Sequence, residues 1–321
     1  MIDAQHFKVT LLSIPNIWLN FYIYGFFEHP GVNLKLKPQN RYYNFNFSNK
    51  LVVLVEYIGK NHTIVIDTDD PNEKHFNYVG FDYVFLSQKL KESKLQYPDN
   101  VFALNPHFPF RHNVLNKLLF YNFIWFKFPI ECFRYYWQNL RLKQFKSILN
   151  LRNVVTGNTI FHYRTLWKKE LHTNLFGALF LNHFEQKGYQ VLGGLVRRKD
   201  NFRTNNPVID RYVVNKRLTN EKYLYYFSKS MYVLNTPAVR GALSWRFAEY
   251  LFANKKIITT PIKVEVPSRF NYFLIEDDSV GGFLQSLGQI DDYDGTFDNS
   301  DLVNKVLFPK EQIDFILQKI T

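Results

Sequence analysis

Residues 230–267 read SMYVLNTPAVRGALSWRFAEYLFANKKIITTPIKVEVP and contain a short apolar run, a loop, a helical stretch and a second apolar run. The runs at 231–234 and 256–259 have the length of buried strands. Ser244 is a preferred N-cap residue and Asn254 tolerates the left-handed conformation that ends helices, so we expect a helix over 244–254. A strand, helix and strand at this spacing are typical of a parallel βαβ unit.

The helix over 244–254 carries the first candidate site. At 100° per residue its apolar face contains Trp245, Phe247, Ala248, Leu251 and Phe252. Arg246 and Glu249 lie on the other face, and Arg246 falls in the first turn, where the helix dipole favours an anion. Ligands of open α/β sheets bind beyond the carboxyl ends of strands, where the loop 235–238 lies. Arg246 is a candidate for binding pyrophosphate and Glu249 for binding ribose hydroxyls; the alternative is an Arg–Glu pair on the surface.

The rest of the chain repeats the alternation of strands and helices. Strands are predicted at 7–12, 51–57, 63–66, 83–86, 101–104, 158–163 and 189–192. Helices are predicted at 17–26, at 87–95, at 174–187 with Thr173 as cap and Gly188 as stop, and at 221–228. A closing helix carries Ile313, Ile316, Leu317 and Ile320 on one face. The pattern restarts after about residue 153, which predicts two α/β units with parallel sheets.

Composition excludes several classes of protein. The chain has 321 residues, of which 46% are apolar, so it is not a disordered tail. Its one cysteine excludes a disulfide framework and favours a reducing, cytoplasmic setting. No P-loop, G-x-G-x-x-G or H-E-x-x-H motif occurs, and no basic leader with a cleavage site precedes the apolar stretch 9–27. We expect a soluble protein with an anionic partner, because the net charge is +12.

Residues 111–152 combine charge with aromatic side chains. They contain eight basic residues against one acid, Glu131, interleaved with Phe, Tyr and Trp. Such a stretch suits the surface of an anionic membrane. Two alternatives stay open: ordinary helices with the aromatic residues in the core, and a nucleic-acid-binding surface.

The segment 230–267 resembles the donor-binding region of GT-B glycosyltransferases, especially bacterial enzymes of surface-polysaccharide biosynthesis and the exostosin-like branch. The resemblance rests on Asn235-Thr236-Pro237, on the S-x-R-x-x-E pattern of Ser244, Arg246 and Glu249, and on a strand ending in Thr260-Pro261. It implies that Glu249 binds the ribose of the donor and that Arg246 lies near its diphosphate. The other donor-binding candidates that it implies are Asn235, Thr236, Pro237 and Ser244. It covers about forty residues. Many retaining members carry a second glutamate eight positions earlier, where this chain has Gly241; we therefore expect an inverting enzyme.

The resemblance implies a GT-B fold, α/β in class, with two Rossmann-like domains whose parallel sheets face each other across a cleft. We expect an acceptor-binding domain over 1–152, a nucleotide-sugar-binding domain over 153–305 and a closing helix over 306–321. The implied function is sugar transfer from a UDP- or GDP-linked donor to a glycan or lipid-linked glycan. No cofactor, no metal and no nucleic acid are expected, and a location at the inner face of the membrane is expected through residues 111–152.

Further candidate residues follow predicted strands. Asp67 and Asp69 come after the strand 63–66 and are candidates for the base that deprotonates the acceptor; they also spell the D-x-D metal signature, and they are common in turns. His107 follows the strand 101–104 and is a third catalytic candidate. Arg164 and Arg197, with Arg198 beside it, follow strands of the second half and are candidates for contacting phosphate.

Two other functions fit the same residues. A metal-dependent GT-A glycosyltransferase would use Asp67 and Asp69 to hold the cation. A non-catalytic protein that binds nucleic acid or another anionic polymer would use the net charge of +12.

Overall fold

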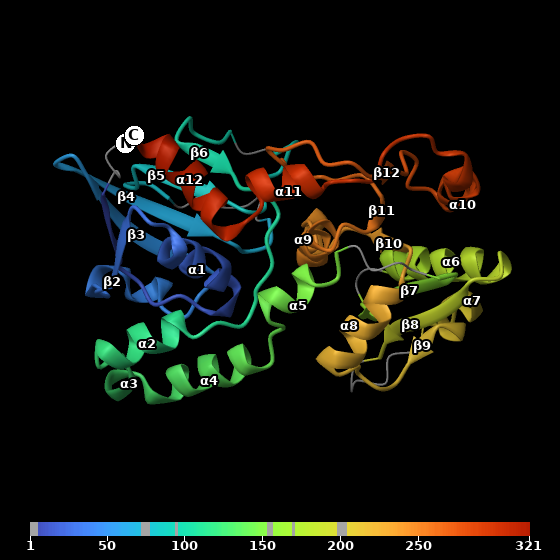
Figure 1. The fold of residues 1–321 in the computed structure, drawn as a ribbon, viewed down its shortest axis with the longest axis horizontal. Helices are drawn as coiled ribbons and strands as arrows, with labels where there is room; N and C mark the ends of the chain where they lie inside the picture. Colours follow the sequence, from blue (N-terminus) through green and yellow to red (C-terminus); the bar gives the residue numbers. More distant parts are fainter. Residues whose placement is uncertain (1–5, 72–77, 94–95, 153–156, 169–170, 198–203) are drawn as a thin grey trace. The chain divides into compact units, whose positions relative to one another are not determined.

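The computed structural model describes residues 6–71, 78–93, 96–152, 157–168, 171–197 and 204–321 (Figure 1). The chain forms two compact units. The first unit is Met1–Phe145 with Val264–Arg269 and Asp301–Thr321, and the second unit is Lys146–Lys263 with Phe270–Ser300. The chain first passes from the first unit to the second after residue 145, before the predicted domain boundary at 152. Residues 264–269 also return to the first unit, which the contiguous domains predicted from the sequence do not include.

The first unit is built on a six-stranded sheet in the order β2-β1-β3-β4-β5-β6 (Figure 1). Its strands are β1 (Phe7–Leu11), β2 (Val32–Leu36), β3 (Lys50–Tyr57), β4 (Lys60–Asp67), β5 (Tyr83–Leu86) and β6 (Val101–Ala103). The pairs β1–β2, β4–β5 and β5–β6 are parallel. Strand β3 is antiparallel to both of its neighbours, β1 and β4.

The prediction of a wholly parallel sheet is therefore wrong for the first unit. Strands β3 and β4 are separated by Ile58 and Gly59 alone, which have positive φ values of 45° and 73°. Two residues with positive φ form a tight hairpin turn, whereas a parallel pair needs a crossover of a dozen or more residues. Five of the six strands lie at the predicted positions, whereas β2 was not predicted.

Helices of the first unit lie between its early strands and after its last strand in the sequence. They are η1 (Ile17–Leu19), α1 (Asn20–Glu28), η2 (Asn40–Phe45), α2 (Val114–Tyr121), α3 (Ile124–Lys127), α4 (Pro129–Leu140), α11 (Ser300–Val306) and α12 (Pro309–Ile320). The predicted helix over 87–95 is wrong for its described residues: Leu90 forms a β-bridge with Val264 instead. Residues 94 and 95 lie outside the described residues.

The closing helix α12 packs on α1 within the first unit. Its predicted stripe of Ile313, Ile316, Leu317 and Ile320 is buried. Contact is close at Gly25, where an added Cβ would lie 2.4 Å from the carbonyl oxygen of Pro309. A side chain at this position would collide with the backbone of α12, so the close contact between the two helices requires glycine here.

The second unit contains parallel strands in two three-stranded groups, β7-β8-β9 and β10-β11-β12. The strands are β7 (Thr159–Thr165), β8 (Gln190–Val196), β9 (Val213–Val214), β10 (Tyr232–Asn235), β11 (Lys256–Thr259) and β12 (Phe273–Leu274). Strands β7 and β10 start side by side, because Met231 N–H donates to Thr159 O at 3.1 Å and Phe161 N–H donates to Ser230 Oγ at 2.9 Å.

The resulting order, β9-β8-β7-β10-β11-β12, is compatible with a Rossmann-like α/β fold, in which the first and fourth strands lie at the centre. Strand β8 is longer than predicted and runs through Gly193 and Gly194. An added Cβ at Gly193, whose φ is 89°, would lie 2.5 Å from His162 O. This glycine therefore permits close pairing of β7 with β8 and does not end the strand.

Helices of the second unit agree with most of the local sequence signals. They are α5 (Phe145–Leu149, which begins at the division), α6 (Leu171–Gln186), α7 (Pro207–Arg211), α8 (Asn220–Lys229), η3 (Val239–Gly241), α9 (Trp245–Phe252), α10 (Val280–Gly288) and η4 (Ile290–Asp292). Ser244 caps α9, and Gly188 and Asn254 have the expected positive φ. The cap prediction at Thr173 is wrong, since α6 already includes this residue. No helix in the described ranges is long and apolar enough to cross a bilayer.

Candidate functional site

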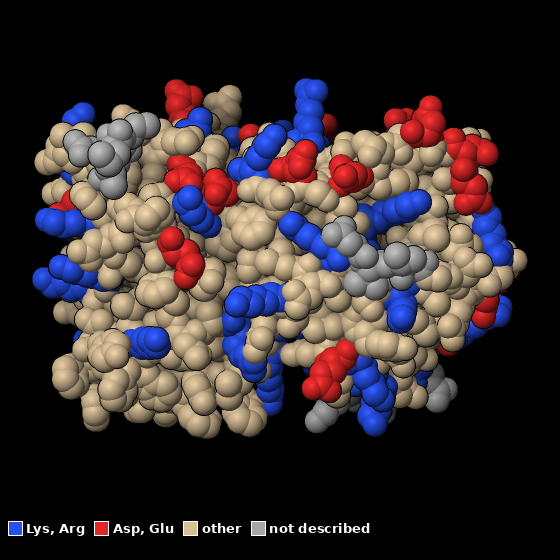
Figure 2. All heavy atoms as spheres, in the orientation of Figure 1, with Lys and Arg blue, Asp and Glu red and all other residues tan. Residues whose placement is uncertain are grey.

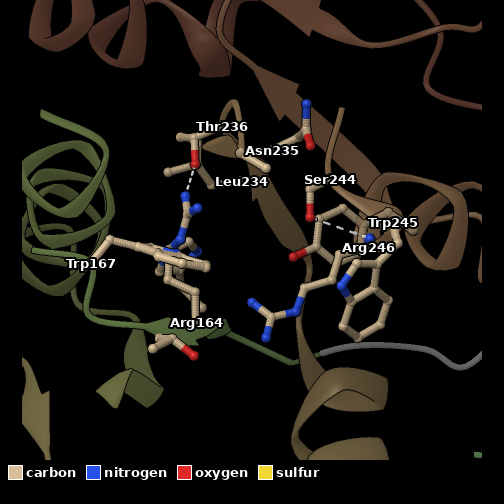
Figure 3. Close-up of a pocket in the computed structure, with 12 residues that line it drawn as sticks. Arg164, Trp167, Leu234, Asn235, Thr236, Ser244, Trp245 and Arg246 are labelled. Atoms are coloured by element: carbon tan, nitrogen blue, oxygen red, sulfur yellow. Dashed lines mark hydrogen bonds between the residues drawn. The ribbon is translucent and has the colours of Figure 1, made fainter. Parts of the chain in front are cut away.

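A cavity of about 170 Å³ opens in the second unit at the carboxyl ends of β7 and β10 (Figure 3). These are the central strands at which the order reverses, the place where ligands bind in open α/β sheets. The lining residues are His162, Arg164, Thr165, Trp167, Leu234, Asn235, Thr236, Ala238, Ser244, Trp245, Arg246 and Tyr250. We call this cavity the arginine pocket.

Strand β7 contributes two functional side chains to the arginine pocket. His162 and Arg164 are two residues apart, so they project from the same face of the strand. Arg164 is buried, and its Nη1 donates a hydrogen bond to Thr236 Oγ1 in the loop that follows β10 (Figure 3). This bond joins the ends of the two central strands and orients the guanidinium.

The start of α9 contributes the second guanidinium. Ser244 Oγ accepts a hydrogen bond from Arg246 N–H at 3.4 Å, which caps the helix and places Arg246 in its first turn. The guanidinium lies 5.9 Å from the ring centre of Tyr163 and 5.4 Å from that of Trp245. Two aromatic rings thus position a cation at a helix N-terminus, where backbone N–H groups already favour negative charge.

Buried polar atoms in the arginine pocket lack partners within the described part of the chain. Both ring nitrogens of His162, Oδ1 of Asn235 and Nε of Arg246 have none. The pKa of His162 is lowered well below its ordinary value, first by burial and then by the positive charges of Arg164 and Arg246. Buried polar groups are normally hydrogen-bonded, so this site has spare capacity for a polar ligand.

The chemistry of the arginine pocket favours an anion. Its lining includes two guanidinium groups and no Asp or Glu among the described residues. The cavity volume of about 170 Å³ lies below the range of about 300–1,000 Å³ for pockets that enclose a drug-sized ligand. The enclosed part therefore suits one or two phosphate groups, and the half-buried rings of Trp167 and Trp245 offer faces to whatever carries them.

Five of the eight predicted ligand-binding residues line the arginine pocket. They are Arg164, Asn235, Thr236, Ser244 and Arg246. Pro237 and Arg197 are not among the lining residues. The backbone N–H of Arg197 is bonded to Val214 O at 3.0 Å as it leaves β8. Arg198 lies outside the described residues.

Glu249 does not line the arginine pocket. It is fully buried in α9, and the hydroxyl of Tyr223 in α8 donates to its Oε2 at 3.0 Å. The alternative of an Arg246–Glu249 pair on the surface is wrong, because the face of α9 that carries Glu249 is also buried. In this geometry the carboxylate ties α9 to α8, and ribose contact by Glu249 has no support.

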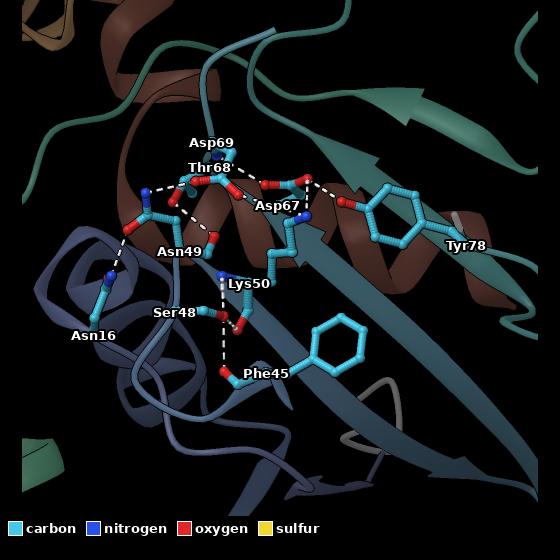
Figure 4. A network of polar contacts seen from close by, with 9 residues as sticks. All are labelled: Asn16, Phe45, Ser48, Asn49, Lys50, Asp67, Thr68, Asp69 and Tyr78. Atoms are coloured by element: carbon cyan, nitrogen blue, oxygen red, sulfur yellow. Dashed lines mark hydrogen bonds and ion pairs between the residues drawn. The ribbon is translucent and has the colours of Figure 1, made fainter. Parts of the chain in front are cut away.

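Asp67 and Asp69 belong to a polar network in the first unit (Figure 4). Asp67 Oδ1 accepts from Asp69 N–H at 2.8 Å and Oδ2 accepts from the hydroxyl of Tyr78. The Lys50 ammonium lies 3.8 Å from Asp67 and 3.5 Å from Asp69, and Asn49 Nδ2 donates to Asp69 Oδ1 at 2.6 Å. Burial raises the pKa of Asp67, while the positive charge of Lys50 opposes that shift.

These contacts favour the turn interpretation of the D-x-D sequence. The Asp67 carboxylate closes a turn over Asp69, and a lysine supplies the positive charge that both carboxylates need. Of the two, Asp69 is the more accessible, with 42% of its side chain exposed. Within the described ranges no group of three or more His, Cys, Asp and Glu side chains is placed to hold a metal ion.

His107 packs in the aromatic core of the first unit. Its Nδ1 lies 3.2 Å from the hydroxyl of Tyr22, and its ring contacts that of Phe21. Burial lowers the pKa of His107 to about 4. These are the contacts of a structural histidine and give a catalytic role no support.

Sequence reasoning missed several pocket residues. His162 was not proposed, although its spacing of two from Arg164 on a predicted strand places both on one face. Trp167 was also missed; its loop is held by Asn174, which accepts from Trp167 N–H at 3.0 Å and donates to Trp167 O at 2.7 Å. No sequence signal connects this loop with Tyr250 in α9.

Comparison of the sequence with known protein families gave no match, and no curated protein matches it. The chemistry of the arginine pocket is therefore the basis on which a function can be assigned.

Proposed function

We propose that this protein is an inverting glycosyltransferase of the GT-B type whose nucleotide-sugar donor binds with its diphosphate in the arginine pocket. One observation carries the proposal: Arg164 from β7 and Arg246 from α9 meet at the carboxyl ends of the central strands, in a pocket whose lining bears no carboxylate among the described residues. Guanidinium groups bind phosphate oxygens by charge-assisted and often bidentate hydrogen bonds.

The proposed chemistry uses the pocket in the departure of the leaving group. A hydroxyl oxygen of the glycan or lipid-linked glycan acceptor attacks the anomeric carbon, and the bond from that carbon to the diphosphate oxygen breaks. Arg164 and Arg246 stabilise the negative charge that develops on the diphosphate, and neutral His162 donates one N–H to it. The acceptor oxygen gives up its proton to a general base, and we assign no residue to that role because the contacts of Asp67 and Asp69 favour the turn interpretation.

A thermal-shift panel of UDP-, GDP-, CMP- and dTDP-sugars, with inorganic pyrophosphate and phosphate as reference ligands, tests the proposal. A ligand at 100 times its dissociation constant adds about 2.7 kcal/mol of stability. We expect one class of nucleotide sugar to stabilise the protein more than pyrophosphate does. Incubation with that donor and a set of glycan acceptors, followed by mass spectrometry, should then show release of the nucleoside diphosphate and a matching mass gain on the acceptor.

If no nucleotide sugar stabilised the protein more than pyrophosphate does, the site would be a general anion pocket and the glycosyltransferase proposal would be refuted. The binding alternative predicts a different result. Random oligonucleotide would then bind with steep salt dependence, and no nucleotide sugar would stabilise the protein.

A further inference from the structure

Helices α2, α3 and α4 follow one another in the first unit (Figure 1), and many of their aromatic side chains are exposed. We call this surface the aromatic face. Its exposed residues are Phe120, Tyr121, Phe123, Phe126, Ile130, Phe133, Tyr136, Trp137 and Leu140. Phe126 is 78% exposed and Phe123 is 72% exposed, so most of each residue meets solvent. Contiguous apolar surface of this kind marks a protein or membrane contact.

Helix α4 shows that the exposure is built into the fold. Its buried residues are Cys132, Tyr135 and Asn139, and two of these are polar. Asn139 Oδ1 accepts from Asn20 Nδ2 at 2.9 Å, and the Tyr135 hydroxyl donates to Asn20 Oδ1 at 2.7 Å. The inward side of α4 is therefore held by specific hydrogen bonds, which fixes the aromatic side outward. A helix of ordinary domain type has the opposite arrangement.

The interpretation of residues 111–152 as helices with their aromatic residues in the core is wrong for most of the aromatic side chains. Leu119 and Tyr135 are buried as that interpretation requires. Phe120, Phe126 and Phe133 are all at least 60% exposed. Nothing in their local sequence separates the two groups, because all lie in helices with apolar residues on several sides.

The helices of the aromatic face also carry positive charge. Between residues 114 and 141 the chain has four basic residues and one acid, a net charge of +3. The basic residues are Lys117, Lys127, Arg134 and Arg141, all exposed. In Figure 2 the surface over α2 and α3, at the lower left, is almost free of Asp and Glu. The Arg141 guanidinium lies 5.2 Å from the Trp137 ring centre, so cation and ring reach the same surface.

We infer that the aromatic face docks on the surface of an anionic phospholipid bilayer. Exposed Phe and Ile side chains would enter the boundary between headgroups and acyl chains, Trp137 and Tyr136 would lie at the level of the headgroups, and the four basic residues would meet lipid phosphates. Lysine is depleted from the cores of protein interfaces, whereas basic side chains among aromatic ones are typical of membrane-surface helices. The inference does not depend on the proposed glycosyltransferase, because it concerns different residues and needs no substrate.

Vesicle co-sedimentation tests the inference. The full chain is mixed with vesicles of phosphatidylcholine alone or of phosphatidylcholine with phosphatidylglycerol. We expect strong binding to the anionic vesicles only, and release when salt shortens the Debye length to about 3 Å. The double variant Phe126→Ser/Phe133→Ser should bind anionic vesicles at least about tenfold more weakly, since neither position can then bury a ring in the bilayer. Lys127→Glu should weaken binding to anionic vesicles by at least about fivefold, the loss expected for one basic side chain.

Matched variants separate docking from general effects. Tyr225→Ser removes a ring that is 60% exposed on α8, and Lys60→Glu reverses an exposed charge on β4; both should bind vesicles like the wild type. The variants of the aromatic face should keep their thermal unfolding midpoint, because the changed side chains are exposed. Absence of binding to anionic vesicles would overturn the inference. A concentration-dependent dimer that the double variant abolishes, without vesicle binding, would assign the face to a second copy of the chain instead.

Discussion

Arg246→Gln is the substitution that tests the arginine pocket most directly. Glutamine keeps much of the length and a donor group but removes the positive charge at the start of α9. The backbone should tolerate it, because the Ser244 cap is made to the backbone N–H of residue 246 and not to its side chain. Arg164 remains in place through its hydrogen bond to Thr236.

The expected loss follows from the geometry. Two unit charges 4 Å apart attract by about 4 kcal/mol at an effective dielectric constant of about 20. Glutamine and water recover part of this, and hydrogen bonds to charged groups contribute about 1.5–3 kcal/mol. We therefore expect Arg246→Gln to weaken binding of UDP and of pyrophosphate by about 2–3 kcal/mol, which is roughly 30- to 150-fold in Kd.

Isothermal titration calorimetry with pyrophosphate and with UDP measures the effect. Arg217→Gln, which removes an exposed guanidinium from the same unit, is the matched control and should leave Kd unchanged. The pKa of His162, followed by NMR, should rise, since one cause of its depression is removed.

Two results would refute this reasoning. A Kd within about threefold of the wild type would show that the anion binds elsewhere. An equal loss in Arg217→Gln would show that net charge, and not the pocket, controls binding.

Three further predictions concern stability. As the pH falls from 6.5 to about 4, the free energy of unfolding should decrease by up to about 3 kcal/mol through His107 alone. The cause is that the unfolded chain binds a proton at this residue, whereas burial lowers the pKa of the folded imidazole to about 4. His107→Gln should therefore make the free energy of unfolding less dependent on pH in this range. Gly25→Ala should destabilise the protein by about 1–3 kcal/mol in urea unfolding, since the new methyl group would lie 2.4 Å from Pro309 O. Tyr223→Phe should cost about 1.5–3 kcal/mol at neutral pH, because it removes the hydrogen bond to the buried Glu249 carboxylate.

The glycine and tyrosine substitutions each have a matched control. Gly281→Ala places a methyl group in open space on α10 and should be neutral or slightly stabilising. Tyr225→Phe removes an exposed hydroxyl and should change stability little. Each prediction would be contradicted by an unchanged measurement. For His107→Gln this is the same decrease of stability at acid pH as in the wild type, and for Gly25→Ala and Tyr223→Phe it is an unchanged free energy of unfolding.

Local signals in the sequence predicted most elements. Ser244 caps a helix because its side chain satisfies a backbone N–H two residues on, and Gly188 and Asn254 end helices because they accept positive φ. These interactions span only a few residues, so they can be predicted from the local sequence without knowledge of the fold. The strand direction in the first unit was not predicted, although the two-residue turn at Ile58 and Gly59 carried the signal for it.

Segments without a strong local preference were decided by distant partners. Residues 87–93 have the polar composition of a helix but form a turn, a single β-bridge residue and a bend, because Lys89 O accepts from Glu265 N–H and Leu90 bridges Val264. These partners lie more than 170 positions later in the chain, and no pattern in the local sequence predicts the contacts with them. The buried environment of Glu249 is of the same kind, since Tyr223 reaches it from another helix.

For the candidate site, the sequence by itself determined that Arg246 begins a helix and that Asn235 and Thr236 follow a strand. It also determined that residues 111–152 unite positive charge with aromatic rings. Only the tertiary structure decided that β7 lies beside β10, which brings Arg164 and His162 to Arg246 across some eighty residues of chain. It also decided that α4 turns its rings outward. Strand order and helix rotation follow from burial summed over the whole unit, so a single segment does not contain them.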